Sequence, residues 1–89
     1  MGYYIWGAGT NTAMLIRLGI LKQELIRGVF DSNKNYQSCK AYGHVISNPA
    51  ELKEKEAYPI VICSQYAFNA IMKAINDMGL GNKVINLFF

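Results

Sequence analysis

Residues 3–13 read YYIWGAGTNTA, and this stretch decides the fold because it holds a strand, a tight turn and the start of a helix. The run Tyr3-Tyr4-Ile5-Trp6 is aromatic and β-branched, which is typical of a strand buried on both faces, and we expect that strand over 3–7. The two glycines that follow predict a tight turn. Apolar residues at helical spacing predict a helix over 12–23, which Gly19 can end early.

Outward from this unit, short β-rich runs alternate with helical patterns. We predict further strands at 25–30, 44–46, 59–64 and 83–88, further helices at 49–56 and 65–79, and a loop over 31–43. Such alternation is typical of a parallel sheet with helices on both faces. The sequence therefore predicts an α/β, Rossmann-like fold with about five strands in a mostly parallel sheet of order 3-2-1-4-5.

The composition indicates a single small domain over residues 1–89, with 17% charged residues and a formal charge of +3. The cations are scattered, which argues against a nucleic-acid partner. Two cysteines form neither a disulfide framework nor a zinc site, so we expect no metal and a cytoplasmic location. We expect no signal peptide, and no membrane span because Arg17 cuts the longest helix-like apolar run.

The turn after the first strand carries the chemistry that the sequence points to. Gly7, Ala8 and Gly9 lie between a strand and a helix, where glycines let backbone amides approach a phosphate at the positive end of the helix. Thr10 and Asn11 continue this turn. We expect the closest approach at Gly9, with a left-handed backbone there.

An acidic residue that binds ribose is expected about 20 residues after such a turn, and Asp31 stands there, at the end of the second predicted strand. Ser32 and Asn33 follow it. Ser64 and Gln65 end the fourth predicted strand, so they are expected to face the turn where the strand order reverses. Ser64 has an alternative reading as a helix N-cap.

One position departs from the dinucleotide pattern G-x-G-x-x-G, because Thr12 stands where the third glycine is expected. This departure favours a mononucleotide or a nucleotide-sugar over a dinucleotide. The alternative interpretation is a strand–turn–helix unit whose glycines serve the turn alone and bind nothing.

The remaining chemistry-bearing residues have structural interpretations. Cys63 lies in an apolar strand and is expected to be an inert core thiol. The single histidine, His44, is expected to be a solvated edge residue. Tyr36 and Tyr42 lie in the polar loop, where two tyrosines could stack on a base but are more simply loop residues.

Five short motifs together resemble a Rossmann-like module of bacterial surface-polysaccharide biosynthesis: IWGAG at 5–9, GVFDSN at 28–33, GHVI with PAEL at 43–52, IVICS at 60–64 and MGL at 78–80. This module stands at the N-terminus of sugar O-acyl- and N-acetyltransferases, and similar ones are attached to glycosyltransferases, sugar methyltransferases and nucleotide-sugar dehydratases. The resemblance implies nucleotide contacts from Gly7, Ala8, Gly9 and Asp31, with Ser32 and Asn33 adjacent. The acyltransferase branch usually has Gly-His in this turn, where Thr10-Asn11-Thr12 stand here.

The interpretation is a nucleotide- or nucleotide-sugar-binding module of a larger glycan-biosynthesis protein, without catalysis of its own. Two alternatives stay open: an NAD(P)-binding fragment of an oxidoreductase, and a structural or interaction module without ligand. The apolar end Leu87-Phe88-Phe89 predicts contact with a neighbouring domain or a second copy of the chain.

Overall fold

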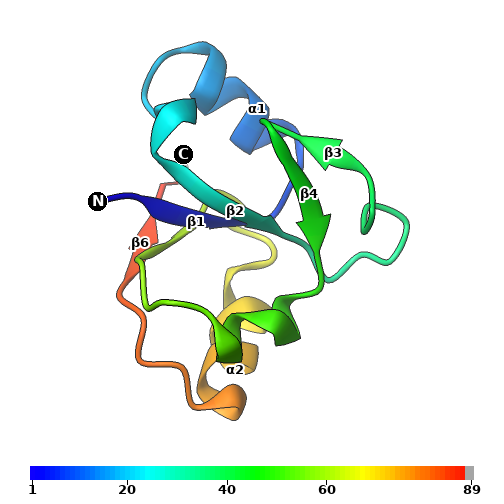
Figure 1. Cartoon of the computed structure of the whole chain (residues 1–89), viewed down its shortest axis with the longest axis vertical. Helices are drawn as coiled ribbons and strands as arrows, with labels where there is room; N and C mark the ends of the chain where they lie inside the picture. Colours follow the sequence, from blue (N-terminus) through cyan, green and yellow to red (C-terminus); the bar gives the residue numbers. More distant parts are fainter. Residues whose placement is uncertain (88–89) are drawn as a thin grey trace.

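The run Tyr3–Trp6 forms strand β1 in the middle of one six-stranded sheet, ordered β3-β4-β2-β1-β5-β6 (Figure 1). The structure is a computed structural model that describes residues 1–87. The other strands are β2 (Ile26–Phe30), β3 (Lys40–Ala41), β4 (His44–Ser47), β5 (Ile60–Ile62) and β6 (Val84–Asn86). All neighbours pair in parallel except β3 and β4. The chain therefore has the predicted α/β class and a mostly parallel sheet.

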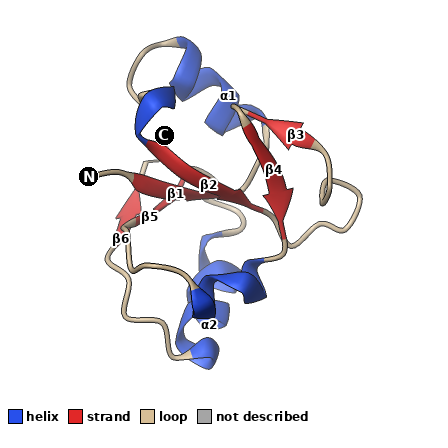
Figure 2. Ribbon diagram, in the orientation of Figure 1, coloured by secondary structure: helices blue, strands red, loops and turns tan. Residues whose placement is uncertain are grey.

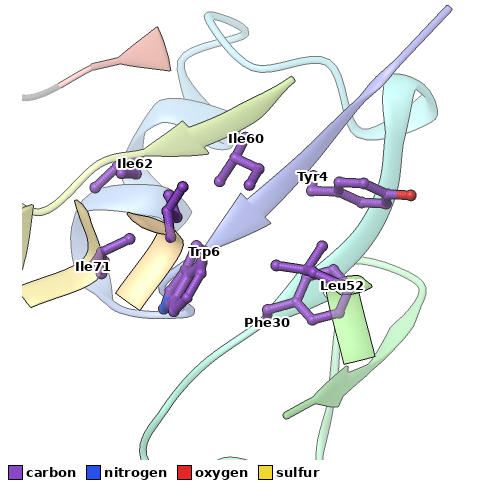
Figure 3. Packing of buried hydrophobic residues seen from close by; sticks show 8 residues of the cluster. Tyr4, Trp6, Phe30, Leu52, Ile60, Ile62 and Ile71 are labelled. Carbon is purple, nitrogen blue, oxygen red and sulfur yellow. The ribbon is translucent and has the colours of Figure 1, made fainter. Parts of the chain in front are cut away.

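Both faces of the sheet are covered by helical segments (Figure 2). Tyr4 and Trp6 point to the face that packs against helix α2 (Phe68–Met78) and the 3-10 helix η2 (Pro49–Glu54). Ile5 points to the opposite face, which packs against helix α1 (Thr10–Arg17). Figure 3 shows the first of these clusters, with Trp6 on the same side of the sheet as Ile71 of α2. Because side chains alternate along a strand, β1 is buried on both faces, as its apolar run predicted.

The strand order differs from the predicted five-strand order because a sixth strand, β3, extends the sheet beyond β4. β3 lies in the stretch predicted to be a loop. It forms a hairpin with β4 through Tyr42 and Gly43, both of which have positive φ, 55° and 82°. A two-residue hairpin turn needs positive φ at both positions, and the usual sequence signal is Asn-Gly or Asp-Gly. A tyrosine carries no such signal, and its ring is half-buried against the α1 face of the sheet.

The helices are shorter than their sequence patterns. α1 begins at Thr10 rather than residue 12 and ends at Arg17, since the chain turns left-handed at Gly19 (φ 78°). The predicted helix 49–56 is a 3-10 helix, with the side chain of Asn48 accepting the N–H of Ala50. In the predicted helix 65–79, residues 65–67 form a turn and α2 follows them. Gly79 caps α2 with φ 69°, a left-handed conformation that commonly ends helices at a glycine.

Two further expectations change. His44 is half-buried rather than solvated, and its Nε2 lies 2.9 Å from the carbonyl oxygen of Ile26. Leu87 packs against the α1-side cluster, with its N–H donating to the carbonyl of Ile62 at 2.9 Å. Phe88 and Phe89, the rest of the predicted contact surface, lie outside the described residues.

Candidate functional site

The turn between β1 and α1 lies at the carboxyl ends of the parallel strands. Its first residue, Gly7, donates its N–H to the carbonyl of Phe30 at 2.7 Å and has φ 118°. Gly9 precedes α1 with φ −86° and ψ −166°, an extended conformation open to any residue. The expectation of a left-handed backbone at Gly9 was wrong, because the chain makes its special bend two residues earlier.

The start of α1 offers backbone donors. Its first helical hydrogen bond is from the N–H of Ala13 to the carbonyl of Gly9 at 3.2 Å, so the N–H groups of residues 10–12 have no acceptor within the helix. No side chain caps this end, and no acidic residue lies in its first turn. The positive end of the helix is therefore available to an anion.

Thr12 holds this turn together. Its side chain is buried, with 2% of its surface exposed, and its hydroxyl donates to the carbonyl of Gly7 at 2.7 Å. Asn11 adds a second link, since its side-chain amide donates to the carbonyl of Cys63 at 3.2 Å. Thr12, which replaces the third glycine of the pattern, thus holds Gly7, the first glycine of the turn, through a hydrogen bond.

Cys63 follows β5 directly, one residue beyond the strand in which it was predicted, and it is buried as its apolar surroundings predicted. Burial raises the pKa of the Cys63 thiol, and a hydrogen bond with the Thr12 side chain offsets part of that rise. The thiol therefore stays protonated at neutral pH and is a poor nucleophile.

Asp31 links two turns. Its Oδ2 accepts the N–H of Ala8 at 2.9 Å, and its Oδ1 accepts the N–H of Asn33 at 2.8 Å. The side chain of Gln37 donates to the Asp31 carbonyl at 2.9 Å. Each carboxylate oxygen has a further lone pair, so Asp31 keeps the capacity to accept hydroxyl groups.

Three hollows lie along this edge of the sheet. The first has a volume of about 220 Å³ and is lined by Gly7, Gly9, Thr10, Asn11, Thr12, Cys63 and Ser64. The second has about 300 Å³ and is lined by Trp6, Gly7, Gly9, Asp31, Ser32, Tyr36, Ser64, Ala67, Ala70 and Ile71. The third, of about 250 Å³, shares Trp6 and Ser32 with the second and reaches Lys34. The first two share both glycines and Ser64, so they are neighbours on either side of these residues.

The sequence-predicted residues divide into three groups. Gly7, Gly9 and Ser64 line the first two hollows, Thr10 and Asn11 line the first, and Asp31 and Ser32 line the second. Ala8 and Asn33 act through their backbone N–H groups on Asp31. Gln65 is exposed and lines none of these three hollows.

Ser64 is not the N-cap of α2, because Ala67 occupies that position. Instead its hydroxyl accepts the N–H of Ala67 at 3.2 Å, in the turn before the helix.

Sequence reasoning missed two contributors to this region. Thr12 was interpreted only as a departure from the glycine pattern, and Trp6 only as a residue of a buried strand, yet both line the hollows. Trp6 had a usable signal, because the last residue of a buried strand stands directly before the glycine turn. Tyr36 was considered as a residue that could stack on a base, with the loop role preferred, and it lines the second hollow.

A scan against models of known protein families finds no match, and a search of curated proteins finds no significant match. Within residues 1–87, no three His, Cys, Asp or Glu side chains lie together as a metal-binding group. In the same range, no helix has the length and apolar character to cross a membrane.

Proposed function

We propose that the chain is a Rossmann-like nucleotide-binding domain that holds a nucleotide or nucleotide-sugar at the β1–α1 turn. The observation that carries the proposal is that Gly7, Gly9 and Asp31 line the same hollow. In this proposal the backbone turn that binds the phosphate and the carboxylate that accepts the ribose hydroxyl groups lie beside each other, as a nucleotide requires.

In this proposal the phosphate is bound by backbone groups. Among the described residues that line the first hollow, none carries a charge, so the donors are the N–H groups of residues 10–12 and the helix dipole. The ribose lies toward Asp31, whose two fixed oxygens have lone pairs left for its hydroxyl groups.

The biological setting rests on the resemblance described from the sequence. We place the domain in bacterial cell-surface glycan biosynthesis, in the cytoplasm, as one module of a larger protein that supplies the catalytic groups. Asp31, the carboxylate of the site, is engaged by two backbone N–H groups, which suits binding better than proton transfer.

A second candidate function is a ligand-free interaction module. One observation favours it: the Gly7 carbonyl and the Ala8 N–H already have partners within the chain, the Thr12 hydroxyl and the Asp31 carboxylate. Under this candidate the glycine turn is only a connection.

Titration of the ¹⁵N-labelled chain with UDP, a UDP-sugar, NAD, AMP and CoA, followed by NMR, tests the proposal. We expect UDP and the UDP-sugar to shift the amide signals of residues 7–12 and 31–33. Shifts with NAD alone would favour the oxidoreductase alternative. No shift at millimolar ligand would favour the interaction module and contradict nucleotide binding.

A further inference from the structure

The second hollow differs from the first in its lining. The first is bounded mainly by a polar turn. The second is also lined by two aromatic residues, Trp6 and Tyr36, and by three aliphatic ones, Ala67, Ala70 and Ile71. Trp6 and Ile71 are core residues, 2% and 6% exposed, so they form its floor. Figure 3 shows Trp6 of β1 and Ile71 of α2 within one cluster, on the side of the sheet that α2 covers. Polar groups from Asp31, Ser32 and Ser64 lie at its other walls.

We infer that this hollow receives the base of the nucleotide and that Tyr36 contacts the base with its ring. The inference rests on the proposed function and deepens it. A base is the flat, largely apolar part of a nucleotide, and the hollow joins an aromatic and aliphatic lining to the glycines and Asp31. Its volume of about 300 Å³ is at the lower end of the range for ligand sites, which suits the base and ribose of one nucleoside.

The loop that carries Tyr36 is fixed to the rest of the site. The N–H of Tyr36 donates to the carbonyl of Asn33 at 3.0 Å, and the N–H of Asn33 donates to Asp31. Tyr36 as a residue is 44% exposed and lines the hollow, so it lies at the border between the hollow and solvent. An aromatic ring held at the rim beside the ribose carboxylate is suited to stack on a base, because every base presents a π-face.

Two tyrosines and the single tryptophan make the inference testable. Trp6 is the only tryptophan and lies in the floor of the hollow, so its fluorescence reports on what enters. Tyr36→Ala removes the ring, Tyr36→Phe keeps it, and Tyr66→Ala is the matched control, because Tyr66 is fully exposed and lines none of the three hollows. The probes are UMP, AMP and ribose 5-phosphate, with affinity followed by the amide signal of Gly9.

We expect UMP or AMP to change the emission of Trp6 and ribose 5-phosphate to leave it unchanged while still shifting Gly9. Tyr36→Ala lowers the nucleotide affinity about tenfold and leaves the affinity for ribose 5-phosphate unaltered. Tyr36→Phe and Tyr66→Ala bind as the parent does. Circular dichroism confirms that each variant is folded, as expected for changes at exposed side chains.

The outcomes separate the inference from the proposed function. If nucleotides and ribose 5-phosphate bind equally well, or if Tyr36→Ala binds UMP and AMP as the parent does, the base does not occupy this hollow and the phosphate turn stands. If Tyr36→Phe loses as much affinity as Tyr36→Ala, the hydroxyl and not the ring makes the contact, and the stacking role is wrong. If no probe binds, the proposed function fails and this inference fails with it.

Discussion

Replacing Gly9 by valine tests the phosphate turn without disturbing the fold. Gly9 has φ −86°, and a Cβ built on it meets no atom within 4 Å. Loss of the glycine as N-cap costs about 1 kcal/mol, and the smaller entropy of the unfolded chain returns about 0.4–1 kcal/mol. We therefore expect the free energy of unfolding of Gly9→Val to stay within about 1 kcal/mol of the parent.

The effect on ligand binding is expected to be larger. Gly9 lines both the first and the second hollow, so we expect the valine side chain to take up space in the hollows beside the start of α1. A phosphate held away from the N–H groups of residues 10–12 loses their hydrogen bonds. We expect the affinity for UDP or AMP to fall at least tenfold, which corresponds to about 1.4 kcal/mol. Calorimetric or NMR titration gives the affinity, and urea unfolding gives the stability.

Two other glycines serve as controls. A Cβ at Gly81 also meets no atom within 4 Å and Gly81 lies outside the hollows, so Gly81→Val should bind as the parent does. Gly7 has φ 118°, where a side chain strains the backbone, so Gly7→Val should lose about 1–3 kcal/mol of stability. A folded Gly9→Val that binds nucleotides with parental affinity would refute the phosphate-turn assignment.

The remaining predictions concern the groups around the turn. Thr12→Val removes the donor to the Gly7 carbonyl and should cost about 1–3 kcal/mol of unfolding free energy in urea, whereas Thr12→Ser, which keeps the hydroxyl, should cost less. Asp31→Ala leaves two backbone N–H groups without their acceptor and should weaken ribonucleotides more than inorganic phosphate in parallel titrations; equal losses would mean that Asp31 acts only through the turn. Iodoacetamide should modify exposed Cys39 and spare buried Cys63 in the folded chain, as mass spectrometry of the peptides would show. Because burial raises the pKa of Cys63, the folded state favours the neutral thiol, so stability should be constant below the ordinary thiol pKa and fall as the pH rises above it; Cys63→Ala should show a shallower alkaline decline in urea unfolding.

Local patterns determined the main elements of this protein. The aromatic and β-branched run of β1 predicted burial on both faces, and the three- and four-residue spacing of apolar residues predicted α2, ended by Gly79. These features are decided by neighbours in sequence: side-chain alternation, helical periodicity and glycine conformation. For the same reason the sequence located the glycine turn, since strand, turn and helix follow one another directly.

The tertiary structure alone decided how that turn is held and what faces it. Asp31 was predicted to bind the hydroxyl groups of a ribose. In the structure its carboxylate oxygens accept the N–H groups of Ala8, which follows β1, and of Asn33, which follows β2 as Asp31 does. Tyr36 lines the second hollow from a loop in which Asn33 and Gln37 are hydrogen-bonded to Asp31. Strand β3 pairs with β4 across a turn in which Tyr42 is left-handed and half-buried against the α1-side cluster. The bond from Ala8 to Asp31 joins the ends of two parallel strands, and such pairings between distant segments leave no periodic pattern in a single sequence.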